Sequence, residues 1–265
     1  MPGQPESLGG TVARWLLARS SVRAEKKRVL VIAPDDFTWR HLQAVPEPWR
    51  YEFIPVFEHD DISSNRPRLF DEMLEEIEKV ISAAPAVDGI VAFWDFPATS
   101  LAALVAERHG LPGPTLESTL KCEHKYWSRL LQREVVPEVV PAFERVDPFD
   151  AAAVAKGKTK YPFWLKPIKS AGSMLGFRIE NDQDLEWALE ETRQRIHVYG
   201  DSFAQAVKHA RLPEALVRFG THYCIAERII SGDQVTLEGY VHRGQIHFHG
   251  AVDSIRQSNE STFSR

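Results

Sequence analysis

The sequence predicts an α/β protein whose second module is of the α+β type. Three observations support this fold class. A continuous apolar run, RVLVIAP, begins at Arg28 and is typical of a strand buried on both faces of a parallel sheet. Apolar residues recur every three or four positions from Leu69 to Ala84, as on one face of an amphipathic helix. Two segments, 234–241 and 245–253, alternate apolar and polar residues about a turn, which predicts a β-hairpin.

The composition excludes several classes of protein. The chain has 265 residues, of which 43% are hydrophobic and 26% charged, with a net charge of −5 and a pI of 6.1. An acidic chain without a basic, aromatic-rich patch is not expected to bind nucleic acid. Cys122 and Cys224 lack CxxC spacing, so neither a disulfide framework nor a zinc site is predicted, and a cytoplasmic setting fits best. No apolar run approaches the roughly 20 residues of a membrane span, so no membrane contact is expected.

Residues 1–25, which mix Pro, Gly and Ser, are expected to form a flexible leader. The first module then covers residues 26–136. Its elements are expected in the order strand, strand, helix, strand, helix, at 28–34, 51–59, 69–84, 88–95 and 100–109. This order predicts a parallel sheet covered by helices. Small ligands tend to bind where such strands end, which makes Asp35, Asp36 and Asp95 candidates for lining a substrate pocket; helix capping is the alternative explanation.

A connecting helix closes the first module. The turn GLPGP at 110–114 is followed by TLESTLKCEHKYWSRLLQ, which predicts a single helix over 115–132 with an apolar side of leucine and aromatic residues. Lys125 lies in this helix, where the common fate of a lysine is simply to be solvated. The second module is expected to cover residues 137–265.

The segment at 160–176, KYPFWLKPIKSAGSMLG, is the most informative part of the second module. Its apolar residues favour a buried strand, which carries Lys166 and runs into a loop of small residues. Such a loop leaves backbone N–H groups uncovered, and exposed amides beside lysines make an anion site. The loop comprises Lys169, Ser170, Ala171, Gly172 and Ser173. Lysines and glycines also flank many ordinary strand ends, so the pattern alone leaves a structural explanation open.

The elements that follow are predicted to be two helices and three strands. Asn181 or Asp182 caps a helix that ends near Ile196. The polar stretch at 198–222 is expected to be helical and exposed. A strand at 223–230 then precedes the hairpin.

Taken in order, these features resemble the ATP-grasp superfamily. The resemblance covers residues from about 28 to 254 and depends on Lys125 after GLPGP, Lys166 before SAGS, and AERIISGDQVTLEG from Ala226. It implies an α/β domain followed by an ATP-grasp domain, with ATP as the cofactor. Lys125 and Lys166 resemble the lysines that neutralise the α- and β-phosphates, and the loop at 169–174 resembles the one that closes over the γ-phosphate.

The resemblance also implies where adenine binds. The strand that contains Glu227, Arg228, Ile229 and Ile230 resembles the one that supplies the adenine contacts. The Glu227 carboxylate or the Arg228 carbonyl would meet the exocyclic amine, and the Ile230 N–H would meet a ring nitrogen.

The ribose and metal sites depart from the family pattern. The family usually has a glutamate seven residues after the hinge glutamate; here Gln234 stands there with Asp233 beside it, and the ribose contact stays open between the two. The family binds Mg²⁺ through a glutamate on one late strand and a Glu-x-Asn pair on the next. The residues after Asp253 offer Glu260 as their only carboxylate, so no metal ligand is assigned and the ATP-grasp domain is expected to be incomplete. Phosphoryl transfer by this chain alone should then be very slow.

The implied function is ATP-dependent ligation. ATP would phosphorylate an unknown small carboxylate to an acylphosphate, from which an amine or similar nucleophile displaces phosphate. One alternative is a bicarbonate-activating enzyme resembling biotin carboxylase or carbamoyl phosphate synthase, which the two glycines of SAGSMLG disfavour. Another is a non-catalytic nucleotide-binding regulatory module. The chain is expected to be a fragment or a natural truncation, and the resemblance admits a homodimer.

Overall fold

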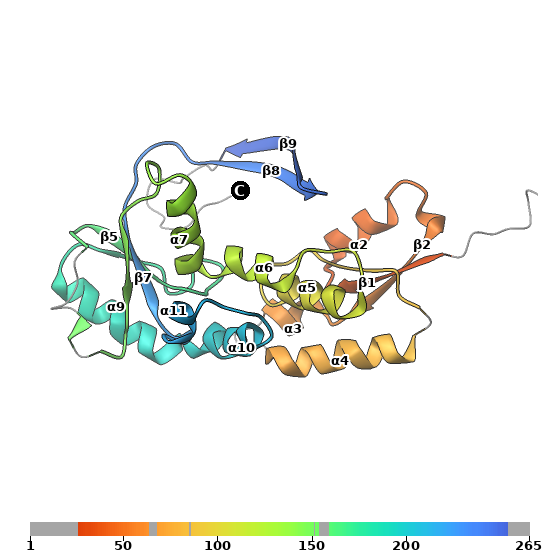
Figure 1. Cartoon of the computed structure of the whole chain (residues 1–265), viewed down its shortest axis with the longest axis horizontal. Coiled ribbons are helices and arrows are strands. Elements are labelled where there is room, and N and C mark those ends of the chain that lie inside the picture. Colours follow the sequence, from red (N-terminus) through yellow and green to blue (C-terminus); the bar gives the residue numbers. More distant parts are fainter. Residues whose placement is uncertain (1–25, 64–67, 85, 151, 154–158, 254–265) are drawn as a thin grey trace, which may run out of the picture. The chain divides into compact units, whose positions relative to one another are not determined.

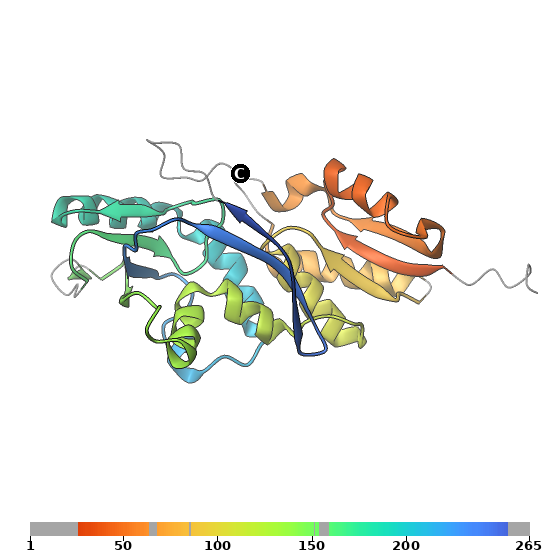
Figure 2. The ribbon, with the colours of Figure 1, turned by 90° about the horizontal axis from the view of Figure 1, so that it is seen from above.

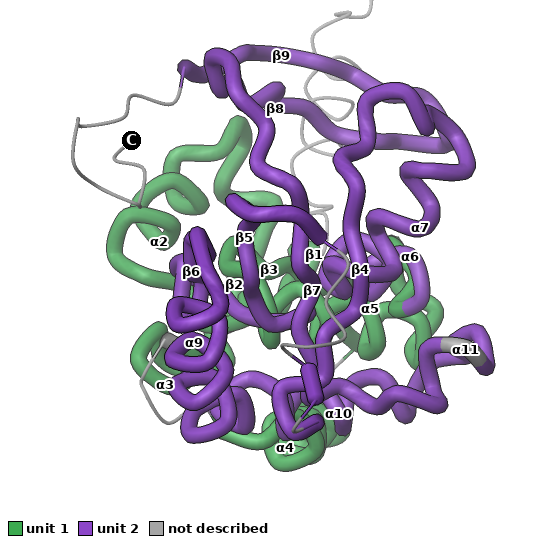
Figure 3. The backbone as a smooth tube through the Cα atoms, turned by 90° about the vertical axis from the view of Figure 1, so that its left-hand side faces the viewer, with its two compact units in different colours: residues 1–116 green, residues 117–265 purple. Residues whose placement is uncertain are grey.

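The computed structural model describes residues 26–63, 68–84, 86–150, 152–153 and 159–253. The chain divides into two compact units, residues 1–116 and 117–265, which Figure 3 shows in different colours. This division comes before the boundary expected at 136, so the connecting helical segment belongs mostly to the second unit. The expected leader at 1–25 and the residues from 254 onward, with Glu260, lie outside the described residues.

The first unit contains the predicted parallel sheet (Figure 1). Its strands are β1 (Lys27–Ile32), β2 (Tyr51–Val56) and β3 (Gly89–Ala92), in the order β2-β1-β3. The central strand is apolar because it is enclosed: Leu30, Val31 and Ile32 are all buried. The helices are α2 (Asp36–Gln43), α3 (His59–Ser63), α4 (Phe70–Ala83) and α5 (Ala98–His109), with a 3₁₀ turn at Pro48–Arg50.

Helix α2 is missing from the sequence-based prediction, which runs from the first strand directly to the second. Adjacent parallel strands need a crossover connection, and a helix usually supplies it. Asp35 caps this helix, since its carboxylate accepts a hydrogen bond from the Thr38 N–H at 2.6 Å. The capping explanation of Asp35 therefore holds.

The connecting segment forms two helices, so the prediction of a single helix is wrong. Helix α6 covers Leu116–Glu123 and helix α7 covers Lys125–Val135. His124 separates them in an extended conformation, and its Nδ1 accepts a hydrogen bond from the Trp127 N–H at 3.1 Å. The Lys125 N–H donates to the carbonyl of Ile168 at 3.0 Å, a tertiary bond that a continuous helix would forgo. Lys125 is thus the first residue of α7.

The second unit is built on an antiparallel sheet in the order β4-β7-β5-β6. The strands are β4 (Phe143–Val146), β5 (Phe163–Pro167), β6 (Phe177–Ile179), which was not predicted, and β7 (Cys224–Arg228). Helix α9 (Asp182–Arg195), capped by Asn181, packs its apolar side on one face of this sheet. Phe163 and Leu165 lie in that core, so the alternate residues Trp164 and Lys166 project from the opposite face.

Helix α10 (His197–Lys208) corrects the expectation that the stretch at 198–222 is exposed. Gly200, Phe203 and Ala206 are buried, at a three-residue spacing that the polar composition of the stretch obscures. The short helix α11 (Glu214–Val217) follows. Of the helices that the structure describes, none is long and apolar enough to cross a bilayer.

The predicted hairpin consists of β8 (Val235–His242) and β9 (Gln245–Asp253), whose paired strands Figure 2 shows from above. Arg243 and Gly244 at its turn have φ values of 50° and 76°, as in the type I′ turns that match the twist of paired strands. The ladder shifts register between Glu238 and Gly239, which marks a β-bulge. Every residue of both strands is exposed.

Candidate functional site

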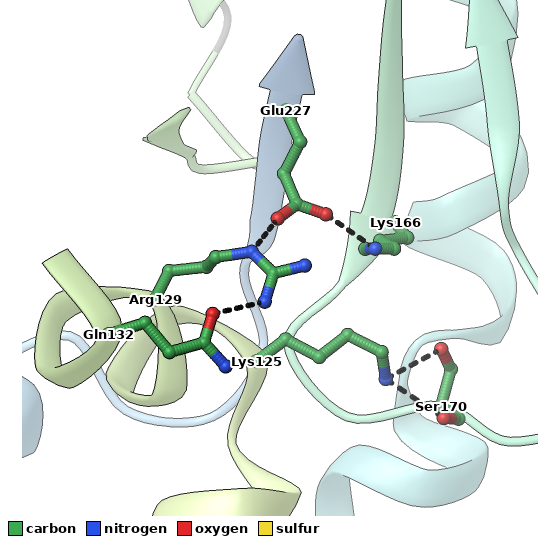
Figure 4. Close-up of polar contacts among 6 residues, drawn as sticks. All are labelled: Lys125, Arg129, Gln132, Lys166, Ser170 and Glu227. Atoms are coloured by element: carbon green, nitrogen blue, oxygen red, sulfur yellow. Dashed lines mark hydrogen bonds and ion pairs between the residues drawn. The ribbon is translucent and has the colours of Figure 1, made fainter. Parts of the chain in front are cut away.

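Charged side chains gather on the face of the second unit's sheet that is turned away from α9. Strand β5 places Lys166 on this face, and β7 places Glu227 beside it. Helix α7 adds Lys125 and Arg129, one helical turn apart. Figure 4 shows these side chains together with Ser170, from the loop after β5. The structure therefore brings together four residues that the sequence predicted: Lys125, Lys166, Ser170 and Glu227.

Glu227 lies at the centre of this cluster. Its side chain is 6% exposed, and its two oxygens contact different cations: Oε1 accepts from Arg129 Nε, and Oε2 pairs with Lys166 Nζ. Burial acts to raise the pKa of the carboxyl, but attraction and hydrogen bonding from Lys166 and Arg129 outweigh burial and hold the pKa below its usual value. Glu227 is therefore an ionised, buried carboxylate held by two cations.

Arg129 is a residue of the site that the sequence predictions omit. Besides Glu227 it contacts Gln132, whose Oε1 accepts from Arg129 Nη1 at 2.7 Å. Gln132 in turn donates to Ser128 Oγ at 3.1 Å. A sequence signal was available, because Lys125, Arg129 and Gln132 are spaced i, i+4, i+7 and share one side of the helix. Lys125 is thus part of a polar stripe on α7.

The loop after β5 holds Lys125. The Lys125 Nζ donates to the backbone carbonyl of Ser170 at 2.9 Å and lies 3.4 Å from the Ser170 hydroxyl. An ammonium binds a carbonyl oxygen and a phosphate oxygen in the same way, as hydrogen-bond acceptors, and the charged acceptor binds more strongly. An anion entering this site could therefore replace the Ser170 carbonyl on Lys125.

Lys169 has different surroundings from the other two lysines. Its side chain is 2% exposed and forms an ion pair with Glu123, the last residue of α6. The residue before Lys169, Ile168, makes two backbone hydrogen bonds. Its carbonyl accepts from the Lys125 N–H, and its N–H donates to the Tyr223 carbonyl at 3.0 Å. The buried ion pair of Lys169 with Glu123 therefore connects the end of α6 to the start of the loop after β5.

The loop itself is tightly turned. Gly172, Ser173 and Leu175 have φ values of 57°, 60° and 57°, in the left-handed region that suits glycine but is unfavourable for the other two. The Met174 N–H donates to the Ala171 carbonyl at 3.0 Å and closes one of the turns. Non-glycine residues in this conformation are enriched at ligand clamps, where the surrounding structure holds them. The conformation is thus consistent with the predicted anion loop.

The predicted nucleoside-binding residues follow Glu227. Arg228 ends β7, and its N–H donates to the Ala142 carbonyl at 2.9 Å, while Ile229 is half-buried. The other three are exposed before the hairpin: Ile230, Asp233 and Gln234. Their roles in binding adenine and ribose remain predictions.

His124 fixes the start of α7 and therefore the position of Lys125. Because its Nδ1 accepts from Trp127, the neutral ring carries its proton on Nε2, which lies 3.3 Å from the Tyr223 hydroxyl. Burial lowers the pKa of His124 to about 4. The folded protein thus keeps this ring neutral at pH values where the unfolded chain protonates it.

We expect this histidine to make stability fall in acid. Its contribution is complete above the unfolded pKa near 6.5 and is lost as the pH falls towards about 4, by up to about 3 kcal/mol. The free energy of unfolding, measured in urea between pH 7 and 4, should therefore fall less steeply for His124→Asn than for the wild type, since asparagine caps the helix without titrating. Equal slopes would contradict this role.

No protein-family model matches the sequence, and no curated protein matches it either. Several solved structures are similar in fold. An L-amino acid ligase from Bacillus licheniformis has a TM-score of 0.61 and 18% identity, over 88% of this chain and 54% of that chain. D-alanyl-alanine synthetase A from Vibrio cholerae has a TM-score of 0.57 and 11% identity, over 88% of this chain and 68% of that chain. Biotin carboxylase from Campylobacter jejuni, in its β,γ-ATP complex, has a TM-score of 0.57 and 18% identity, over 88% of this chain and 52% of that chain.

These likenesses establish the fold. The chain has the ATP-grasp fold, which confirms the predicted α/β domain followed by an ATP-grasp domain. It spans about half the length of the Bacillus and Campylobacter proteins.

Proposed function

We propose that this protein binds ATP on its second unit and is an ATP-dependent ligase that activates a carboxylate as an acylphosphate for attack by an amine or similar nucleophile. The convergence of Lys125, Lys166 and Arg129 beside the loop at 170–173 is the observation that carries this proposal. Three cations against the single carboxylate of Glu227 leave an excess of positive charge on this side of the sheet, which suits a polyanion. The similar structures named above are a ligase, a synthetase and a carboxylase.

Each part of the site has a role in this proposal. Lys125 and Lys166 would neutralise phosphate oxygens, and the loop at 170–173 would cover the phosphates and exclude water. Both Glu227 oxygens already contact cations, so we assign the exocyclic amine of adenine to the Arg228 carbonyl. The Ile230 N–H would then bind a ring nitrogen.

Magnesium is the expected companion of ATP in such an enzyme, because it offsets the charge that moves during phosphoryl transfer. Among the described residues, no group of three or more His, Cys, Asp and Glu side chains is placed to hold a metal ion. We therefore assign no ligand and no step to the metal.

Binding of ATP, ADP and adenosine to the 265-residue chain tests the nucleotide site. Two lysines that bind phosphate should make ATP and ADP bind at least about tenfold more tightly than adenosine, in titration calorimetry at low salt. The preference should shrink as salt is added, since screening weakens charge pairs. Equal affinity for all three compounds, or no binding at all, would contradict the proposal.

Formation of ADP and phosphate tests the ligase reaction separately. Turnover that needs both a small carboxylate and an amine supports the ligase. Turnover that needs bicarbonate instead supports the second candidate, which the likeness to biotin carboxylase favours. Turnover by this chain alone is expected to be very slow, so the result that would indicate a regulatory module is ATP binding without turnover in a protein that also carries the family's metal-binding strands.

A further inference from the structure

Glu227 needs a cation for as long as it stays buried. Its carboxylate is ionised and largely shielded from water, and removing the partner of such a charge is strongly unfavourable. The proposed function, however, requires one of its two partners, Lys166, to bind a phosphate group. Another cation must then neutralise the Glu227 carboxylate while the nucleotide is bound.

The two cations on Glu227 differ in how firmly they are held. The guanidinium of Arg129 is fixed on two sides, by Glu227 and by Gln132 at 2.7 Å. Lys166 ends in a compact ammonium on a flexible stem, whereas the planar guanidinium of Arg129 bonds two acceptors at once; the two side chains are about equally exposed, at 30% and 29%. An arriving phosphate can therefore recruit Lys166 while Arg129 stays on the carboxylate.

Other charged groups around Glu227 have partners of their own. The residues opposite Glu227 on the two neighbouring strands are Phe143 and Trp164, which carry no charge. The nearest charged residue on the same side of β4, Arg145, lies 3.5 Å from the centre of the Phe219 ring. Lys125 on α7 bonds Ser170. Within the described part of the chain, the charge balance at Glu227 thus depends on Lys166 and Arg129.

We propose that Arg129 is a positioning residue that keeps Glu227 neutralised and so leaves Lys166 available to the phosphates of a nucleotide. This inference rests on the proposed nucleotide site. Arg129 needs no contact with the nucleotide to act in this way. Without Arg129, phosphate and a buried carboxylate compete for the single ammonium of Lys166.

A double-mutant cycle with Glu227 tests this role. Arg129→Gln should weaken ADP binding by about tenfold in the wild-type background, because Lys166 is then retained by Glu227. The same substitution in a Glu227→Gln background should cost less than about twofold, since no carboxylate remains to compete. Arg129→Lys, which keeps the charge, should restore most of the affinity. An equal loss in both backgrounds, or no loss in either, would overturn the proposal.

Arg193→Gln is the matched control. Arg193 pairs with Glu190 on α9, which covers the other face of the sheet, so this variant loses the same charge away from the site and should bind ADP as the wild type does. A loss as large as that of Arg129→Gln would show a general charge effect and overturn the role of Arg129.

A second measurement separates this inference from the proposed function. If the wild type binds no nucleotide, the proposed function is wrong. The effect of Arg129 on Glu227 can still be measured, by ¹³C NMR titration of the Glu227 carboxyl. Arg129→Gln should then raise the pKa of Glu227, because one of the two cations that lower it is removed. An unchanged pKa would overturn the role of Arg129.

Discussion

Replacing Lys166 with methionine should weaken ATP binding by about a hundredfold, the largest effect on ligand binding that we expect. Methionine keeps the apolar stem of the side chain but removes the charged donor. Glu227 keeps Arg129, so the fold should persist, with a loss of only about 1 kcal/mol in the free energy of unfolding. Titration calorimetry and urea unfolding measure the two effects independently.

Lys208→Met is the control for this loss of charge. Lys208 is exposed at the end of α10, whereas the cations that pair with Glu227 are Arg129 and Lys166, so its removal should leave ATP affinity unchanged. Adenosine affinity should also change little in Lys166→Met, because the lost contact is with phosphate. If Lys166→Met bound ATP as tightly as the wild type, the phosphate role of Lys166 would be wrong.

Replacing Lys169 with methionine should have the largest effect on stability. The substitution takes the lysine from Glu123, whose side chain is also buried, and should lower the free energy of unfolding by about 3 kcal/mol. The double variant Lys169→Met with Glu123→Met removes both charges and should recover most of that loss, because an apolar pair of similar size replaces a buried ion pair at little cost. Urea unfolding of the three variants and the wild type measures this coupling.

The same variants separate folding from ligand binding. The sequence places Lys169 in the phosphate loop, whereas the structure turns its ammonium to Glu123. Nucleotide binding by the refolded double variant therefore measures any phosphate role apart from stability. A single variant as stable as the wild type would contradict the structural role.

The fold could be predicted well where local patterns and burial agree. The apolar run of β1 and the three-and-four spacing of α4 each determine one type of element, and both elements form where expected. The break at His124 could not be predicted in this way, because the flanking residues all suit a helix. It depends on the bond from Lys125 to Ile168, which is a contact between distant parts of the chain.

The site could be predicted only in part, for a similar reason. Lys125, Lys166 and Glu227 were predicted from their order along the chain, and the structure brings them together. Arg129 was missed although it recurs on the same side of α7 as Lys125. The pairing of Lys169 with Glu123 spans 46 residues, and no spacing rule connects two charges at that separation.

The bulge in the hairpin sets the phase of its apolar pattern. Paired residues share a face, and the ladder pairs Leu237 with Ala251 and Val241 with Ile246. In a regular strand Ala251 and Ile246, five residues apart, would lie on opposite faces. The extra residue, His249, brings them onto the same face, so the hairpin is amphipathic although its sequence does not alternate strictly. Deleting His249 would leave the apolar residues in phase, whereas deleting His247 with the bulge retained would move Ile246 to the polar face.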